Sequence, residues 1–135
     1  MSRLPVPIVV AIIGEGGSGG ALGIGVGDRV LMLEYSVYSV ITPEGCASIL
    51  FRDAARASEA AEAMKITARD LQELGVINEI IPEPGGGAHR DPERTARHLG
   101  EAIERHLTEL EELSPAELVN GRLERFMSMG EYKEG

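Results

Sequence analysis

The sequence has no tryptophan, only two phenylalanines and only three tyrosines, so aromatic side chains contribute little to any core. A core must instead be built from isoleucine, valine, leucine, alanine and methionine. Cys46 is the single cysteine, which excludes an intramolecular disulfide bond and a cysteine-based metal cluster. No apolar run approaches the roughly 20 residues of a membrane span, and residues 1–13 lack the features of a secretory signal peptide. These absences predict a cytoplasmic protein with no membrane partner and no metal of its own.

Basic residues are also scarce. The 13 lysines and arginines stand against 22 aspartates and glutamates, which gives a net charge of −9 and a pI near 4.8. An acidic surface repels phosphate backbones, so this balance argues against nucleic acid as a partner. Apolar residues make up 43% of the 135 residues, enough for the core of one domain.

The first half of the chain predicts strands that alternate with short helices. Residues 8–13 form a continuous, mostly β-branched run, typical of a strand buried on both faces inside a parallel sheet. Such a strand needs a neighbour on each side, so we expect further strands from outside this chain. Thr42 and Pro43 predict the N-cap and first residue of a helix. The other predicted elements are a helix over 18–26, a strand over 29–33, an extended segment over 35–42 and a helix over 43–51.

The second half is dominated by helices. Residues 58–74 carry one apolar stripe that ends at Gly75, which predicts a single helix. A short strand over 76–81 and a Pro- and Gly-rich loop over 82–92 follow. Two capped helices are then predicted, over 92–113 after Asp91 and over 115–129 after Ser114, with a frayed tail over 130–135. His98 and His106 are expected on the helix surface, and Cys46 is expected to pack as a small apolar side chain.

Eight glycines fall within residues 14–27, directly behind the first apolar run. Gly14, Gly16 and Gly19 match the dinucleotide-binding pattern G-x-G-x-x-G, with Glu34 placed to bind a ribose, so an NAD(P)-binding Rossmann-like domain is one interpretation. A second interpretation is an oxyanion hole, in which the N–H groups of Gly19 and Gly20 hold a developing negative charge. A third is that the glycines only allow close packing of a strand and a helix.

Several longer motifs occur in a fixed order, and together they resemble the carboxyltransferase α subunit of bacterial acetyl-CoA carboxylase. The resemblance covers residues 6–129 and implies a crotonase (ClpP-like) α/β fold, a spiral of ββα units, here incomplete and followed by C-terminal helices. Residues 1–91 would be the C-terminal part of that core and residues 92–135 its helical extension. The motifs are Gly-Glu-Gly-Gly-Ser-Gly-Gly-Ala-Leu (14–22), Gly-Val-Gly-Asp (25–28), Tyr-Ser-Val-Tyr-Ser-Val-Ile (35–41), Pro-Glu-Gly-Cys-Ala-Ser-Ile-Leu (43–50), Ile-Ile-Pro-Glu-Pro (80–84) and Gly-Gly-Ala-His-Arg (86–90).

The resemblance also implies an activity. The family transfers a carboxyl group from carboxybiotin, held on a biotin carboxyl carrier protein, to acetyl-CoA, giving malonyl-CoA for fatty acid biosynthesis. The α subunit works with a zinc-bearing β subunit in a heterotetramer of two copies of each, and binds no cofactor directly. By the motif match, the N–H groups of Gly19 and Gly20 would stabilise the ureido oxygen of biotin. Further candidates for substrate binding are Gly16, Gly17, Ser18, Glu44, Gly45, His89 and Arg90.

Two other expectations accompany this resemblance. Family members are about twice as long, so the chain resembles their C-terminal half and is expected to be inactive by itself; a non-catalytic interaction fragment is the remaining alternative. Glu44 has a purely structural alternative as well, because an acid in the first turn of a helix favours the helix dipole.

Overall fold

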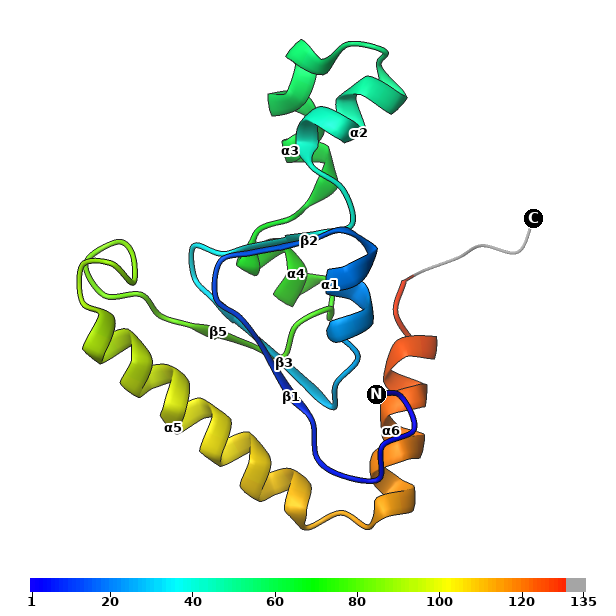
Figure 1. The fold of residues 1–135 in the computed structure, drawn as a ribbon, viewed down its shortest axis with the longest axis vertical. Helices are drawn as coiled ribbons and strands as arrows, with labels where there is room; N and C mark the ends of the chain where they lie inside the picture. Colours follow the sequence, from blue (N-terminus) through cyan, green and yellow to red (C-terminus); the bar gives the residue numbers. More distant parts are fainter. Residues whose placement is uncertain (131–135) are drawn as a thin grey trace.

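The computed structural model describes residues 1–130, which form an α/β fold built from two successive ββα units (Figure 1). The first strand of each unit enters a three-stranded parallel sheet of order β1-β3-β5, and the second strand enters a two-stranded parallel sheet of β2 and β4. This alternation between two sheets is the spiral that the sequence resemblance implied. The two units are β1 (Val9–Ile12), β2 (Glu15–Gly17) and α1 (Ser18–Ile24), then β3 (Arg29–Leu33), β4 (Val37–Ser39) and α2 (Pro43–Leu50).

The remaining elements surround these strands (Figure 1). Helices α2 and α3 and the 3₁₀ turn η1 pack against one another in a lobe that stands away from the strands, whereas α5 runs along the three-stranded sheet. The caps predicted for α2, α5 and α6 are confirmed, because the side chains of Thr42, Asp91 and Ser114 each accept a hydrogen bond from a first-turn amide. These elements are η1 (Ala54–Arg56), α3 (Ala57–Met64), α4 (Ala68–Glu73), β5 (Glu79–Ile81), α5 (Pro92–Glu111) and α6 (Pro115–Met127).

The core lies on both faces of β3. Val30 and Met32 point to one face, where they pack with Leu71 of α4, and Leu31 and Leu33 point to the other, toward α5. These four residues of β3 are all buried, because side chains alternate between the two faces of a strand and both faces of this central strand are covered. The predicted aliphatic core is confirmed: its buried members are isoleucine, valine, leucine, methionine and alanine side chains.

Within residues 1–130, β1 pairs only with β3 and Ala11 is exposed, so the further strands that the sequence analysis expects from outside this chain stay a prediction. Two other sequence-based predictions need correction. The helix predicted over 58–74 is two helices, because Lys65 takes a left-handed conformation (φ 53°) and Thr67 caps a new helix. Residues 15–17, for which no strand is predicted, form β2. The predicted fraying over 130–135 falls almost wholly outside the described residues.

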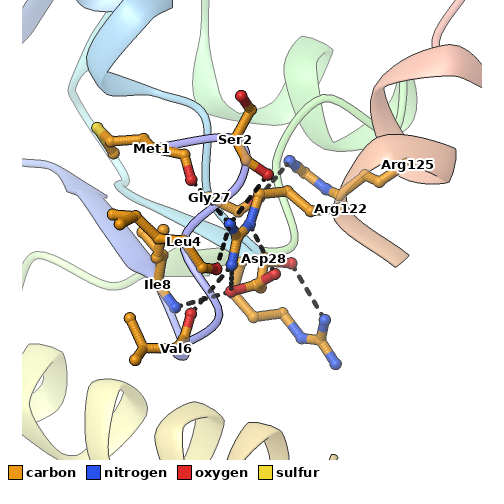
Figure 2. Close-up of polar contacts among 10 residues, drawn as sticks. Met1, Ser2, Leu4, Val6, Ile8, Gly27, Asp28, Arg122 and Arg125 are labelled. Carbon is orange, nitrogen blue, oxygen red and sulfur yellow. Dashed lines mark hydrogen bonds and ion pairs between the residues drawn. The ribbon is translucent and has the colours of Figure 1, made fainter. Parts of the chain in front are cut away.

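The C-terminal helix is tied to the N-terminal segment by one buried arginine (Figure 2). The Arg122 side chain is 1% exposed and forms two hydrogen bonds of 2.9 Å with the carboxylate of Asp28. The same guanidinium donates to the carbonyl oxygens of Met1, Ser2, Leu4 and Val6. A buried charge is tolerated only when it is paired and its remaining donors are satisfied, and both conditions hold here.

The division into a core over 1–91 and an extension over 92–135 stays a prediction, although α5 does begin at Pro92. Among residues 1–130, no helix combines the length and the apolar character needed to cross a bilayer.

Candidate functional site

The glycine segment forms a tight junction between a strand and a helix. Strand β2 ends at Gly17, and Ser18, the first residue of α1, takes a positive φ of 66°. A non-glycine residue in this left-handed region costs about 1–2 kcal/mol. Such strain persists only where the surroundings fix it, and it is concentrated at functional sites.

The N–H groups of Gly19 and Gly20 lie in the first turn of α1, where a helix has no internal acceptors for its amides. Both residues are exposed, and the Gly20 amide has only a long contact of 3.4 Å with Ser18 Oγ. A Cβ on Gly19 would meet nothing within 4 Å, and one on Gly20 only that Oγ, at 3.7 Å. Both positions are therefore open to solvent, at the helix terminus where amides lack acceptors within the helix.

A groove of about 610 Å³ runs past this junction. Its polar side is the start of the glycine segment, residues 15–18, and its apolar wall includes Val40, Ile41 and Ile66. Gly19 and Gly20 do not line this groove, although they follow directly after Ser18. It brings together four of the residues predicted for substrate binding, namely Gly16, Gly17, Ser18 and Glu44. The fifth, Gly45, is beside Glu44 on α2, but its amide donates to Thr42 Oγ1 at 3.2 Å and so serves the helix cap.

His89 and Arg90 do not line this groove. Both are exposed on the loop between β5 and α5, which is organised by the buried carboxylate of Glu83. Glu83 accepts hydrogen bonds of 2.7 Å from the amides of Tyr35 and Ala88. The structure therefore gives these two residues a separate place, and their role in substrate binding stays a prediction.

The dinucleotide interpretation does not fit this geometry. Gly16 lies in β2, paired with Tyr38, and not in a turn that cradles a phosphate. Helix α1 has only seven residues, and Glu34 accepts a hydrogen bond from the amide of Glu83 at 3.3 Å. The glycine pattern is thus explained by a strand, a turn and a short helix.

Sequence reasoning missed two buried polar side chains. His106 is 8% exposed and its Nε2 lies 2.8 Å from Glu79 Oε2, so its predicted place on the surface is wrong, whereas His98 is only partly buried. Arg122 had no sequence signal, because its acceptors lie about a hundred residues away. Within residues 1–130, no three His, Cys, Asp or Glu side chains gather in a group suited to a metal ion.

A family model described as acetyl co-enzyme A carboxylase carboxyltransferase-like matches residues 1–130. Two curated relatives, both called acetyl-coenzyme A carboxylase carboxyl transferase subunit alpha, come from Geobacter metallireducens and Synechococcus elongatus. They are 60% and 59% identical to this chain over 134 residues, 99% of its length. The match spans 42% and 41% of these relatives, so the chain covers less than half of their length.

A solved structure shows the same fold. It is a Pseudomonas malonate decarboxylase hetero-tetramer in complex with coenzyme A, one chain of which matches 90% of this chain and 48% of its own length, with a TM-score of 0.58 and 22% identity. The crotonase-like α/β fold implied by the sequence resemblance is confirmed. Motifs, fold and family model agree, and the chain belongs to the acetyl-CoA carboxylase carboxyltransferase-like family.

Proposed function

We propose that this chain forms the biotin-binding side of a carboxyltransferase that moves a carboxyl group from carboxybiotin to acetyl-CoA, giving malonyl-CoA. The observation that carries this proposal is the exposed pair Gly19 and Gly20 in the first turn of α1, within the region that the family model matches. The reaction needs no side-chain nucleophile, since the carboxyl group passes from one substrate to the other.

The amides act on charge that develops during the transfer. As the bond between the biotin nitrogen and the carboxyl carbon breaks, its electron pair spreads onto the ureido oxygen. The methyl group of acetyl-CoA loses a proton as its carbon bonds to the carboxyl carbon, and that proton ends on the biotin nitrogen. The N–H groups of Gly19 and Gly20 donate to that oxygen, and losing one such donor typically lowers the rate by about 100- to 1000-fold. The fixed turn at Ser18 holds the two donors in place before the charge appears.

The groove supplies the rest of the binding site in this proposal. Val40 and Ile41 present apolar surface beside the polar glycine segment, which suits a bicyclic ring with one polar edge. Glu44 lies at the same groove, where it stabilises the first turn of α2 or contacts the substrate. We place the coenzyme A thioester mainly on the partner subunit.

The partners follow from the family. The relatives are named as α subunits, so we propose a β subunit as the main partner, in a heterotetramer of two α and two β subunits that carries zinc only on the β side. The biotin arrives on a separate carrier protein. We place the whole assembly in the cytoplasm.

The test is a biotin-dependent decarboxylation of malonyl-CoA, which runs the transfer in reverse. The chain is assayed with a β subunit, with and without the part of the Geobacter metallireducens α subunit that lies outside the match, supplied as a second chain. We expect turnover in the complete mixture and little from the chain alone. A complete mixture that assembles but shows no biotin-dependent turnover would contradict the proposal and favour a non-catalytic fragment.

A further inference from the structure

Helix α1 carries the two proposed donor amides, yet few contacts hold it. None of its seven residues is buried, its N-terminus has no side-chain cap, and Leu22 and Ile24 are 48% and 66% exposed. The peptide link to β2 fixes one end of the helix. Something else must fix the other end if Gly19 and Gly20 are to keep one direction.

Tyr38 of β4 provides that contact. Its backbone is held on both sides, because Tyr38 pairs with Gly16 in the β2–β4 register and its amide donates to the carbonyl of Ile66 at 3.2 Å. Its phenol oxygen donates to the Ala21 carbonyl of α1 at 3.3 Å. Burial raises the pKa of the Tyr38 phenol, so the hydroxyl stays protonated and remains a donor at neutral pH.

At two glycines, the Tyr38 ring lies so close to the backbone that a side chain would collide with it. A Cβ on Gly16 would lie 2.8 Å from Tyr38 Cδ2, and a Cβ on Gly25 would overlap the Tyr38 hydroxyl. Gly16 lies in the strand before α1, and Gly25 is the C-cap of that helix. The ring therefore spans the glycine segment from its first strand to the far end of the helix, and both contact points are bare backbone.

We infer that Tyr38 is a positioning residue: it fixes α1 against β2 and so sets the direction of the Gly19 and Gly20 amides. This inference rests on the proposed function, because the amides matter for the reaction only if they receive the charged oxygen. Tyr38 itself is assigned no contact with the substrate.

The first measurement is made on this chain and needs no activity. Backbone ¹⁵N order parameters of Gly19 and Gly20 are compared in the wild type, Tyr38→Leu and Gly25→Ala, with Gly23→Ala as control, because a Cβ on Gly23 meets nothing within 4 Å. We expect values near 0.85 in the wild type and control, and values below about 0.6 in the two test variants. Values near 0.85 in a folded Tyr38→Leu variant would overturn the inference.

A suppressor pair keeps the test decisive if Tyr38→Leu fails to fold. Tyr38→Phe removes the hydroxyl that a Cβ on Gly25 would overlap, which leaves the Ala21 carbonyl oxygen at 3.0 Å and the ring carbon at 3.4 Å as its neighbours. The double variant Gly25→Ala/Tyr38→Phe should therefore recover part of the order that Gly25→Ala loses, but not all of it, because the hydrogen bond from the hydroxyl to Ala21 is lost as well. If Gly25→Ala leaves both amides ordered, or if Tyr38→Phe rescues nothing, the ring does not position the helix.

The second measurement uses the complete mixture, in which the chain is assembled with a β subunit and the part of the α subunit that lies outside the match. We expect Tyr38→Leu to lower kcat by about 100-fold, since a displacement of roughly 1 Å at a reacting group costs this much, while the KM for malonyl-CoA stays unchanged. A purely structural loss would instead reduce the amount of active complex and leave kcat per assembled complex unchanged. An inactive wild type would contradict the proposed function, and the order parameters would still decide the role of Tyr38.

Discussion

At the scale of single residues, the glycines of this chain divide by what surrounds them. Gly19 and Gly23 face open space, whereas Gly25 and Gly27 are buried, and a Cβ on either would overlap a neighbour. The sequence predicted the glycine-rich junction and its amides from spacing alone. The sequence did not predict why residue 25 is a glycine. The side chain that leaves no room there is the ring of Tyr38, which approaches Gly25 only in the folded chain.

The buried pair of Arg122 and Asp28 gives a strong prediction for stability. Arg122→Met leaves the Asp28 carboxylate buried without its cation, and removing one member of such a pair typically costs about 3–5 kcal/mol. We expect that loss in the free energy of unfolding, measured by urea denaturation. Arg56→Met is the control, because the Arg56–Glu59 pair is 44% and 55% exposed, and exposed pairs contribute about 1 kcal/mol or less.

A double variant separates the charge from the packing. Arg122→Met/Asp28→Asn removes the uncompensated carboxylate, so its loss should be clearly smaller than the sum of the two single losses. Losses that simply add would show that the two side chains act independently.

The ionisation of Glu79 predicts how the stability of the protein depends on pH. Burial opposes ionisation of this carboxyl group, but hydrogen bonds from Arg105 and His106 outweigh burial and lower its pKa. Since the unfolded pKa is about 4.3, this stabilisation is complete above that pH and is lost as the pH falls through the lower folded pKa. The melting temperature of Glu79→Gln should therefore fall less than that of the wild type between neutral pH and acid. Glu101→Gln, at an exposed position of α5, should follow the wild type; equal slopes in all three proteins would refute the assignment.

At the scale of elements, prediction succeeded where signals are local. Proline and the capping residues placed the starts of α2, α5 and α6 correctly. It failed at α3 and α4, because the apolar stripe over 58–74 continues through the break at Lys65 and hid the local cap in which Thr67 accepts a hydrogen bond from the amide of Asp70. It also failed at β2, whose residues Glu-Gly-Gly have no strand propensity and pair only because β4 lies beside them.

The break itself can be tested at Lys65. Its φ of 53° is left-handed, a conformation that costs a non-glycine residue about 1–2 kcal/mol. Replacing Lys65 by glycine removes this cost, although the greater freedom of glycine in the unfolded chain offsets part of the gain in stability. We expect Lys65→Gly to raise the melting temperature. Glu62→Gly, inside α3, should lower it, with a cost of about 1 kcal/mol. A lower melting temperature for Lys65→Gly would argue for one continuous helix.

At the scale of the whole molecule, two ββα units distribute their strands between two sheets and leave one edge of β1 without a strand partner among residues 1–130. The sequence alone predicted this α/β class and, through ordered motifs, the family. The sequence could not show which of the expected site residues share a groove. Ser18 and Glu44 come to line the same groove only because β2 pairs with β4. The same geometry separates His89 and Arg90 from that groove.

The central claim is that the amides of Gly19 and Gly20 receive the charged oxygen of biotin. The most direct measurement is kcat for biotin-dependent malonyl-CoA decarboxylation by the complete assembly containing Gly20→Leu, beside Gly23→Ala in the same helix. The leucine Cβ meets only Ser18 Oγ at 3.7 Å, so the fold should survive while the side chain covers the amides. The account predicts a loss of about 100-fold or more for Gly20→Leu and none for Gly23→Ala; a folded, assembled Gly20→Leu enzyme with wild-type kcat would contradict it.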